Sequence, residues 1–468
     1  MSTAQAKRHK PRRTQLTSVN DDGSRYIIHP ADTTGIFTNC RRILATLLIL
    51  FYAALPWIKI GGYPAVFLDT NAMRFHFFGL TFVSHDIWLG FFLITGLGFG
   101  LFYVTSLFGR IWCGWACPQT VFLEHVYRRI ERWLEGDAPK RRKLDEAPWT
   151  MNKVARRGLK HGIFLFISAA IAHMFMAYFV SIPALWDMMQ HSPREHWSVF
   201  LFVFVYTALL YFNFAWFREQ LCIIICPYGR LQSALIDDHS VVIGYDENRG
   251  EPRGKVSDPN AADCIDCNRC VQVCPTGIDI RQGLQMECVG CSNCIDACDS
   301  IMDKVGRPRG LIRYDSFQGL AGEKTRWIRP RTIAYSILMF IGMAVMYFSM
   351  SGLSSASITV WRMGGPPYHV DESYVRNQYM VRITNRKNQP TSFSLSMENS
   401  HPEYIVNGID QPLLIDGNGD SLKALVVLAP RESYDGESTM LLNVLDEKGN
   451  IIADRSVEFI GPDPALLK

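Results

Sequence analysis

Cysteine is absent from the parts of the sequence where an exported protein would need it. The chain has 13 cysteines in 468 residues, but none follows Cys298, and none lies in segments 61–86 and 183–197 between apolar runs. Disulfides persist in oxidising compartments. The pattern therefore excludes a disulfide-stapled exported domain and predicts that the thiol chemistry lies on the reducing side of a membrane.

A cleavable signal peptide is also missing from the start of the sequence. The first residues include the basic stretch "AKRHKPRRTQ", and no apolar core with a small-residue cleavage site comes before the first long apolar run. Such a run is expected to stay in the membrane as an anchor. Basic residues collect on the cytoplasmic side of membrane helices, so we expect the N-terminus to be cytoplasmic.

Five apolar runs approach or reach the length that crosses a bilayer, about 18 to 20 residues. Overall composition hides them, because 48% of residues are hydrophobic and 20% are charged. The sequence therefore predicts an integral membrane protein with five transmembrane helices. The runs are about Ile43 to Ile60, Ile87 to Phe108, Gly162 to Ile182, Ser198 to Phe217 and Ile333 to Met350.

Lysine and arginine are distributed unevenly between the connecting segments. Residues 110–160 contain twelve of them, whereas the segments on the other side carry one each, Arg74 and Arg194. The positive-inside rule then makes residues 218–331 cytoplasmic and the tail from about Gly352 periplasmic. Within the basic segment, "PQTVFLEHVYRRIERWLEG" has apolar residues near helical spacing and a basic face, which is typical of a helix on the membrane surface. The following "KRRK" at 140–143 is interpreted as a solvated anchor.

The predicted parts of the chain follow from these patterns. After the fifth helix, short runs such as "LKALVVLAP" alternate apolar and polar residues between Asn, Gly, Asp and Pro, which is typical of a small β-sandwich. We expect a basic cytoplasmic tail at 1–40, a four-helix membrane domain at 41–245, a cytoplasmic ferredoxin-like domain at 246–330, the fifth helix at 331–352 and a periplasmic β-sandwich at 353–468.

Eight cysteines form the strongest motif in the sequence. "CIDCNRCVQVCP" and "CVGCSNCIDACD" each have the Cys-x2-Cys-x2-Cys-x3-Cys spacing, with which bacterial ferredoxins hold two four-iron four-sulfur clusters. The fourth cysteine of each motif binds the other cluster. The predicted ligands are Cys264, Cys267, Cys270 and Cys298 for one cluster, and Cys288, Cys291, Cys294 and Cys274 for the other. Pro275 follows the last cysteine of the first motif, whereas Asp299 follows the last cysteine of the second motif. Two structural zinc sites are the alternative, although these normally use separated Cys-x2-Cys pairs.

A second cysteine motif occurs twice, about a hundred residues apart. "WCGWACP" contains Cys113 and Cys117, and "LCIIICP" contains Cys222 and Cys226. Positions i and i+4 share a helix face, so each pair is predicted to point together. The proline favours the start of a new helix, whose positive end lowers the pKa of a thiol. Two pairs can converge on a soft ion such as Cu(I), on zinc or on iron–sulfur. Alternatively, all four are buried structural cysteines.

Isolated histidines and one cysteine are weaker candidates. His173 lies near the middle of the third apolar run, and an ionisable residue at that depth is a candidate metal or functional residue. A neutral histidine bonded between helices explains it equally well. His76 and His85 could bind Cu(II) but are ordinary loop histidines otherwise, and Cys40 is interpreted as structural.

Long segments of the sequence resemble a known family. "GRIWCGWACPQTVF", "FREQLCIIICPYGRLQSALID", "GYDENRGEPRG" and "DACDSIMDKVGRPRGLIRYDS" are similar to the cytochrome c oxidase accessory protein family called CcoG, RdxA or FixG, over about residues 75–316. The resemblance implies a bacterial inner-membrane protein with an immunoglobulin-like outer domain. It also implies a cupric reductase that supplies Cu(I) for assembly of the cbb-type oxidase. The related NapH and NosR proteins share the Cys-x3-Cys-Pro theme and pass quinol electrons. His85 and Cys40 lie outside these motifs.

Three functions follow as hypotheses. In the first, electrons pass through two [4Fe-4S] clusters to copper near Cys113, Cys117, Cys222 and Cys226 and reduce Cu(II) to Cu(I). In the second, the chain is a quinol-linked conduit in which His173 and the fourth helix flank a quinone. In the third, it is a non-enzymatic oxidase assembly scaffold. Expected partners are the bilayer, copper ions, oxidase assembly or copper-delivery proteins, an electron donor that the sequence does not identify and a possible second copy, with no nucleic acid.

Overall fold

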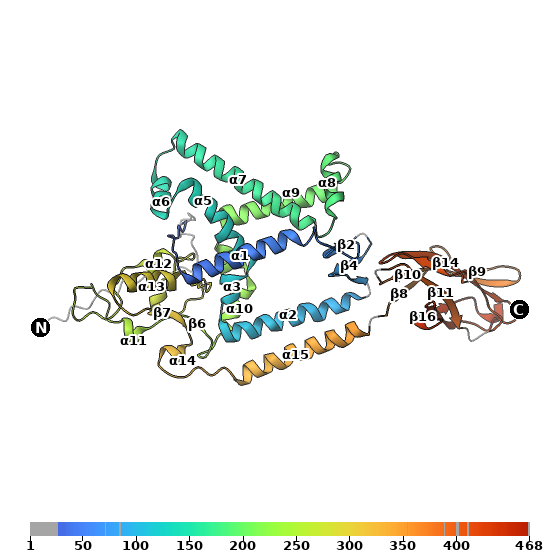
Figure 1. The fold of residues 1–468 in the computed structure, drawn as a ribbon. Coiled ribbons are helices and arrows are strands. Elements are labelled where there is room, and N and C mark those ends of the chain that lie inside the picture. The colour runs from blue at the N-terminus through green and yellow to red at the C-terminus, as the bar shows by residue number, and fades with distance from the viewer. Residues whose placement is uncertain are drawn as a thin grey trace. The chain divides into compact units, whose positions relative to one another are not determined.

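The computed structural model describes residues 27–466 except 71, 84–85, 353, 388, 399–401 and 410. Most of the predicted basic tail and His85 therefore lie outside the described residues. The chain divides into two compact units (Figure 1). The first comprises residues up to Ala54, Phe92–Ala177 and Pro183–Met343, and the second comprises Leu55–Phe91, Tyr178–Ile182 and the chain from Ala344.

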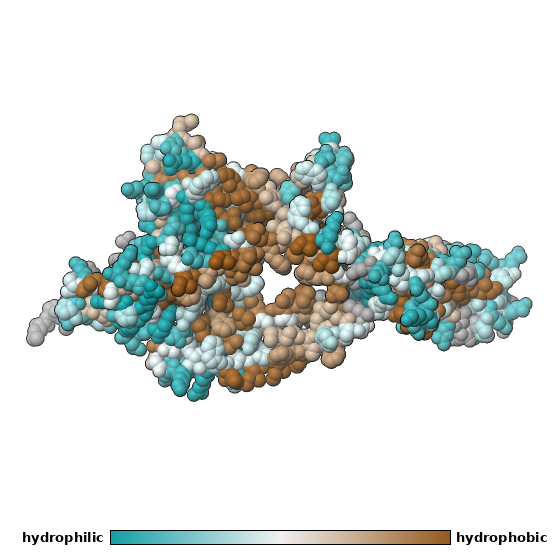
Figure 2. Space-filling view, viewed as in Figure 1, coloured by the Kyte–Doolittle hydropathy of each residue, from teal (hydrophilic) through white to brown (hydrophobic). Residues whose placement is uncertain are grey.

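Among the described residues, five helices are long and apolar enough to cross a membrane, as predicted. Many of their apolar side chains are exposed, and Figure 2 shows this hydrophobic surface. A surface of this kind is stable only against lipid. The helices are α1 (Ile36–Ala54), α2 (Ile87–Phe108), α7 (Met151–Met176), α9 (Trp197–Phe212, continued by the π-helix η3, Asn213–Phe217) and α15 (Pro330–Ser351).

The boundaries of two helices differ from the prediction. The first helix ends at Ala54 instead of continuing to Ile60, because Pro56 follows and Lys59–Ile60 forms strand β1. The third begins at Met151 rather than Gly162, since the Thr150 side chain caps it by accepting a hydrogen bond from the Lys153 backbone. Charged residues thus occupy its first turns.

Both Cys-x3-Cys-Pro motifs interrupt a helix. Helix α3 (Ile111–Trp115) ends before Cys117, and α4 (Pro118–Phe122) starts with the proline. The second motif has the same break between η4 (Leu221–Ile225) and α10 (Pro227–Leu235). Cys117 and Cys226 are N-caps with extended backbone, as the prolines predict. The prediction that each pair shares one helix face is wrong, because the helix stops between the two cysteines.

The eight-cysteine module is built on a two-stranded antiparallel sheet. Strand β6 (Val242–Tyr245) pairs with β7 (Ile312–Asp315), although 66 residues separate Tyr245 from Ile312. The intervening chain forms α11 (Glu247–Gly250), α12 (Arg269–Gln272), η5 (Ile280–Gln282) and α13 (Asn293–Val305). The strands and helices share one apolar core, which includes Ile243, Ile295 and Met302. This core fixes the two cysteine loops. Helix α14 (Phe317–Leu320) follows β7.

Further short helices complete the first unit. After α4 the chain continues as η2 (Leu123–Tyr127), α5 (Arg128–Glu135) and α6 (Ala138–Glu146). Tyr127 and Phe214 stack at 4.4 Å between ring centroids and pack with Phe164. Aromatic packing therefore joins the segment after the first Cys-x3-Cys-Pro motif to the later helices α7 and η3.

The second unit contains the predicted β-sandwich. One sheet has the order β12-β14-β10-β8 with β9 paired to β10, and the other has the order β13-β11-β15-β16. Buried and half-buried residues alternate along β10, whose inward residues include Val375, Tyr379 and Val381. The strands are β8 (Ala356–Arg362), β9 (His369–Val370), β10 (Tyr374–Asn385), β11 (Thr391–Glu398), β12 (Ile405–Asn407), β13 (Leu413–Ile415), β14 (Asp420–Pro430), β15 (Ser438–Leu445) and β16 (Ile451–Phe459).

The loop between the first two membrane helices belongs to the same unit as the sandwich. Strands β3 (Val66–Asp69), β4 (Arg74–Phe77) and β5 (Leu80–Val83) form a small antiparallel sheet, preceded by β1 and β2 (Tyr63–Pro64). Arg74 forms an ion pair with Asp420, and the Thr81 hydroxyl donates to Asn418 Oδ1 at 2.7 Å. These contacts hold the loop against the β-domain.

Candidate metal centres

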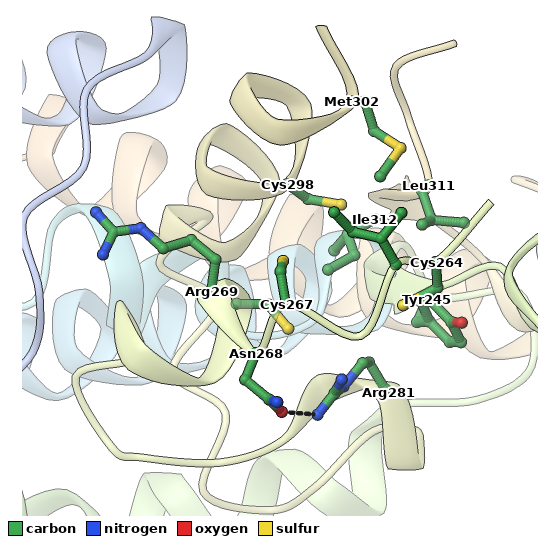
Figure 3. Close-up of a pocket in the computed structure, with 12 residues that line it drawn as sticks. Tyr245, Cys264, Cys267, Asn268, Arg269, Arg281, Cys298, Met302, Leu311 and Ile312 are labelled. Carbon is green, nitrogen blue, oxygen red and sulfur yellow. Dashed lines mark hydrogen bonds between the residues drawn. The ribbon is translucent and has the colours of Figure 1, made fainter. Parts of the chain in front are cut away.

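Four cysteines line one pocket of the eight-cysteine module. Cys264, Cys267, Cys270 and Cys298 surround it together with Arg281 (Figure 3). The chain can curl around the pocket because Asp266 and Asn268 have left-handed backbone conformations. We call it the Cys264 pocket. It brings together the cysteines that spacing assigned to the first cluster, including the distant Cys298.

A second pocket contains the other four cysteines. Cys274, Cys288, Cys291 and Cys294 line it, and Cys270 lies in its wall. We call it the Cys288 pocket. Its remaining walls include Ile243, Ile278 and Ile280, which exclude water. The fourth cysteine of each motif thus faces the pocket of the other motif, as the predicted crossover requires.

The chemistry of these pockets suits iron–sulfur clusters. Burial raises the pKa of Cys270 and of Cys298 to about 12 and that of Cys288 to about 11, so thiolates need a bound cation in these pockets. Within the described part of the chain, no three His, Cys, Asp or Glu side chains are grouped to hold a single metal ion. Four thiols around a pocket can instead bind the corners of a larger metal cluster.

The Cys-x3-Cys-Pro cysteines also lie near one another, and we call Cys113, Cys117, Cys222 and Cys226 the thiol quartet. Burial, with smaller effects of the nearby thiols of Cys117, Cys113 and Cys226, raises the pKa of Cys222 to about 12. Burial likewise raises the pKa of Cys117, against hydrogen bonds from the Gln119 and Thr120 backbone at the helix start. The expected lowering of a thiol pKa by the helix end is therefore outweighed by desolvation.

Gln232 and Arg110 organise the quartet, and the sequence analysis identified neither. The Gln232 amide Nε2 donates to Cys113 Sγ at 3.4 Å, while its oxygen accepts from Arg110 Nε. Arg110 Nη2 also donates to Gly229 O at 2.6 Å, just after Cys226. Arg110 therefore joins the two motifs. No spacing rule marks these residues, since their contacts arise from segments 119 to 122 residues apart.

The quartet lies against the Cys288 pocket. Arg110 Nη1 donates to Cys288 O at 3.0 Å. A Cβ atom on Gly114 would lie 2.4 Å from Gly290 O, and Gly290 has a positive φ of 66°. Only glycine fits such an approach. The first Cys-x3-Cys-Pro segment therefore contacts the loop between Cys288 and Cys291 directly.

The histidine candidates lie apart from these sites. His173 Nδ1 is 2.8 Å from the Ala169 carbonyl oxygen of its own helix, so this contact does not join two helices. His76 is buried, stacks on Tyr63 at 4.0 Å, and lies 2.9 Å from the Thr81 hydroxyl. Burial and the nearby Arg74 lower the pKa of His76 to about 4. Cys40 is exposed on α1, away from both pockets and the quartet.

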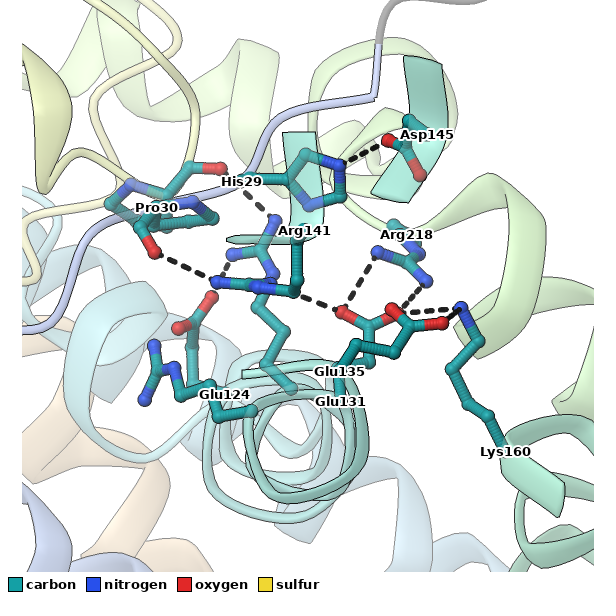
Figure 4. A network of polar contacts seen from close by, with 12 residues as sticks. His29, Pro30, Glu124, Glu131, Glu135, Arg141, Asp145, Lys160 and Arg218 are labelled. Carbon is teal, nitrogen blue, oxygen red and sulfur yellow. Dashed lines mark hydrogen bonds and ion pairs between the residues drawn. The ribbon is translucent and has the colours of Figure 1, made fainter. Parts of the chain in front are cut away.

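The expected membrane-surface helix has its charges buried instead. Glu131 and Glu135 of α5 contact Arg141, Lys160 and Arg218 (Figure 4). Glu131 and Arg141 are 2% and 1% exposed, so the interpretation of "KRRK" as fully solvated is wrong for Arg141. A basic helical face has the same sequence pattern whether water or distant carboxylates neutralise it. Arg128 of α5 extends this network to Glu219 and to the Pro275 carbonyl beside the Cys288 pocket.

A cavity of about 400 Å³ lies between α1, α7, α9 and the first Cys-x3-Cys-Pro motif. Its polar groups include the Gln119 and Asn213 amides, which bond to each other at 2.7 Å. Residues on both sides of Cys117 contribute to its wall. The lining is Leu48, Ile49, Tyr52, Ala116, Pro118, Gln119, Val121, Phe122, Ile171, Phe175, Tyr206, Leu210, Asn213 and Phe214.

Comparison with known proteins matches three family models to this chain. A 4Fe-4S dicluster domain covers residues 217–317, a 4Fe-4S binding domain covers 88–140, and the IG-like fold at the C-terminal of FixG covers 346–462. The ranges include the eight-cysteine module, the first Cys-x3-Cys-Pro motif and the β-sandwich. Cluster binding and an immunoglobulin-like C-terminal domain therefore agree with the sequence analysis.

Two relatives match this chain over most of its length. Protein RdxA of Cereibacter sphaeroides is 35% identical over 444 residues, which cover 90% of this chain and 94% of RdxA. Nitrogen fixation protein FixG of Rhizobium meliloti is 34% identical over 423 residues, 79% of each chain. A FixG-related protein from Vibrio parahaemolyticus matches 23% of this chain and 95% of its own, at 17% identity and a TM-score of 0.21.

Proposed function

This chain belongs to the RdxA and FixG family of membrane iron–sulfur oxidoreductases, and we propose that it reduces Cu(II) to Cu(I) at the thiol quartet for assembly of a cbb-type cytochrome c oxidase. One observation carries the proposal. The four quartet thiols lie close enough to raise the pKa of Cys222 together, and Arg110, which lies beside Cys113, donates to Cys288 O of the Cys288 pocket at 3.0 Å. When bound, the clusters supply one-electron transfer.

The quartet suits the product of this reaction better than the substrate. Cu(II) favours nitrogen and oxygen ligands, whereas Cu(I) favours soft thiolates. One electron added to Cu(II) gives Cu(I), and no bond to carbon, nitrogen or oxygen is made or broken. Burial keeps the empty thiols protonated, because it raises the pKa of Cys113 to about 11. Copper binding therefore releases thiol protons to water.

Arg110 and Gln232 support this site without acting as ligands. The Gln232 amide donates to Cys113 Sγ at 3.4 Å and orients that thiol. Arg110 lies beside Cys113 and lowers its pKa against the larger effect of burial. A fixed positive charge thus favours the thiolate form that binds copper.

A quadruple Cys-to-Ser variant of the quartet tests the proposal. We expect the purified variant to keep its iron–sulfur absorption and, after reduction by dithionite and removal of the excess, to reduce Cu(II) at least tenfold more slowly than wild type. Cys40→Ser is the matched control, because Cys40 is an exposed cysteine outside the quartet. Wild-type copper reduction by the quadruple variant would remove the quartet from the mechanism.

The sidedness of the chain and its partners are part of the same proposal. We place the N-terminus and the cysteine module in the cytoplasm and the β-sandwich in the periplasm of a bacterial inner membrane, because Lys and Arg concentrate in residues 110–160. Reporter fusions after residues 150 and 352 test this placement. Oxidase assembly or copper-delivery proteins are the proposed partners, and a homodimer is tested by mass measurement in nanodiscs.

The cavity beside Cys117 favours a second candidate function, a quinol-linked electron conduit. Its wall is mostly aliphatic and aromatic, with the Gln119 and Asn213 amides as polar groups for a carbonyl or hydroxyl. Ligand sites commonly combine these features. Ile171 and Phe175 line the cavity in place of His173, which the sequence analysis had expected to flank a quinone.

A matched pair of substitutions tests this second function. Leu210→Trp fills the cavity, whereas Leu209→Trp places the same side chain on the exposed face of α9. Only the first is expected to abolish cross-linking of a photoreactive quinone to the segments 116–122 and 206–214. Equal labelling of both variants, or none of wild type, would reject the conduit.

A further inference from the structure

Two buried arginines beside the Cys288 pocket have no carboxylate partner within the described residues. Arg41 is 3% exposed and Arg110 is 9% exposed, and neither forms an ion pair there. Buried charges are normally paired. An uncompensated pair at one place therefore indicates a function beyond folding.

Arg110 forms hydrogen bonds with the chain around the Cys288 pocket. Its Nη1 atom donates to Cys288 O at 3.0 Å and to Met286 O, while Nε and Nη2 donate to Gln232 and Gly229. All these acceptors are neutral. The full positive charge of the guanidinium therefore remains beside Cys288.

Arg41 of α1 reaches the same pocket from another direction. Nη1 donates to the Asn293 side chain at 2.7 Å, next to Cys294, and Nε donates to Gly114 O at 2.9 Å. Its Nη2 is buried without a hydrogen-bond partner. Arg41 and Arg110 thus hold the two chain segments that meet at Gly114 and Gly290.

The third arginine of this region is compensated. Arg128 donates to the Pro275 carbonyl at 3.2 Å, but it also pairs with Glu124 and Glu219. Two carboxylates offset its charge. Arg41 and Arg110 consequently remain without an ion pair among the described residues beside the Cys288 pocket, where Glu287 precedes Cys288 and Asp296 bonds to Thr38.

The Cys264 pocket differs, because the arginine beside its cysteines is paired with carboxylates. Its arginine, Arg281, pairs with Asp266 at 2.6 Å and with Asp279 at 2.8 Å. Asp299 follows Cys298 directly and raises the pKa of that thiol, in addition to the larger effect of burial. The charge of Arg281 is therefore compensated, while Arg269 also lines this pocket and Cys267 is exposed to water.

These charges act differently on the oxidised and reduced states of a cluster. Reduction adds one negative charge, so a nearby cation stabilises the reduced state and a nearby carboxylate destabilises it. Burial of the Cys288 pocket disfavours the added charge. The same burial removes the water that would screen the two guanidinium groups, so their effect is strong there.

We propose that Arg41 and Arg110 give the cluster of the Cys288 pocket the higher reduction potential of the two, which directs electrons from the Cys264 pocket toward the thiol quartet. The inference rests on the proposed two-cluster relay and deepens it. Each transfer moves one electron, which oxidises the Cys264-pocket cluster and reduces the other. Both arginines are positioning residues because they contact the cluster loops rather than copper.

A redox titration of the full-length protein in nanodiscs, followed by paramagnetic resonance and without copper, tests this directly. Two potentials are expected in wild type. Arg110→Gln and Arg41→Gln should each lower only the higher one, by at least a tenfold change in the oxidised-to-reduced ratio, about 59 mV. Asp279→Asn should raise only the lower one, because it removes a carboxylate beside Arg281.

Two further variants separate charge from structure. Arg110→Lys keeps the positive charge and should restore most of the potential that Arg110→Gln loses. Arg309→Gln removes an exposed arginine paired with Asp303 and should move neither potential. If Arg110→Gln fails to retain clusters, Arg41→Gln and Asp279→Asn decide the question.

Three outcomes would overturn the inference. These are an unchanged higher potential in Arg41→Gln and Arg110→Gln, a joint shift of both potentials, or a loss in Arg110→Lys as large as in Arg110→Gln. Failure of copper reduction with dithionite in otherwise normal wild type would instead overturn the proposed function, because the titration contains no copper.

Discussion

Glu131→Gln should destabilise the first unit more than other single carboxylate changes within residues 110–160. Glu131 is 2% exposed and accepts from Arg218, with Arg141 Nη1 at 3.5 Å and Lys160 Nζ at 3.9 Å. Removing one member of a buried ionic group leaves the other charges uncompensated, which costs about 3 to 5 kcal/mol. The amide of Gln can accept only part of these bonds.

The pKa of Glu131 gives a similar magnitude. Burial raises the pKa of this carboxyl, but Arg218 and Lys160 lower it more strongly, from 4.5 to about 2. At 1.36 kcal/mol per pKa unit, that difference corresponds to about 3 kcal/mol. Because the folded pKa is depressed, this stability is present above pH 4.5 and disappears as pH falls toward 2.

Thermal unfolding in nanodiscs, followed by intrinsic fluorescence, measures the effect. We expect Glu131→Gln to lower the melting temperature by roughly 6 to 10 °C at pH 7, and the difference from wild type to shrink below pH 4.5. Glu146→Gln is the matched control because Glu146 ends α6 at an exposed position. A change as small as that of Glu146→Gln, or one that persists unchanged in acid, would refute the reasoning.

Three further predictions test the metal centres and the second unit. Gly114→Ala should reduce the iron content per chain, since its Cβ would lie 2.4 Å from Gly290 O and displace the cysteine loop. Cys298→Ser should change the same paramagnetic signal as Cys264→Ser, and Cys274→Ser should change the other signal. If Cys274→Ser instead changed the same signal as Cys264→Ser, the crossover would be contradicted. Asp420→Asn weakens the partly buried ion pair with Arg74 and should increase proteolysis between residues 55 and 86. Asp454→Asn, at an exposed site on β16, is the control and should not increase it.

Cysteine spacing predicted the grouping in both pockets because three ligands of each site are local. Residues within Cys-x2-Cys-x2-Cys must lie close together in any fold, so only the crossover partners Cys274 and Cys298 depended on tertiary structure. The apolar runs predicted five long helices for the same local reason. Local sequence patterns were therefore sufficient to predict features that are made by residues close together in the sequence.

Features made by distant segments could not be predicted in this way. Glu131 and Arg218 are 87 residues apart, and Arg110 and Gln232 are 122 residues apart. A sequence shows the charge of Glu131 but not its partner, so the buried network had the pattern of a membrane-surface helix. The break between Cys113 and Cys117 is different, because Pro118 is a local signal from which the sequence predicted the start of a new helix.

The charge of Arg110 acts on both the Cys288 pocket and the quartet. It donates to Cys288 O at 3.0 Å and lowers the pKa of Cys113 against the larger effect of burial. Four thiolates carry more negative charge than either copper ion neutralises, and reduction of Cu(II) leaves one more negative charge uncompensated. The guanidinium should therefore favour arrival of the electron at copper as well as at the cluster.

Arg41 lies near the cluster loop but makes no contact with Gln232 or Gly229 among the described residues. We therefore expect Arg110→Gln to slow dithionite-driven Cu(II) reduction severalfold more than Arg41→Gln, even when both lower the cluster potential equally. Stopped-flow measurement of Cu(I) formation with a Cu(I)-specific chelator compares the two variants. Equal slowing would mean that Arg110 acts through the cluster alone, and that the quartet receives no electrostatic support from it.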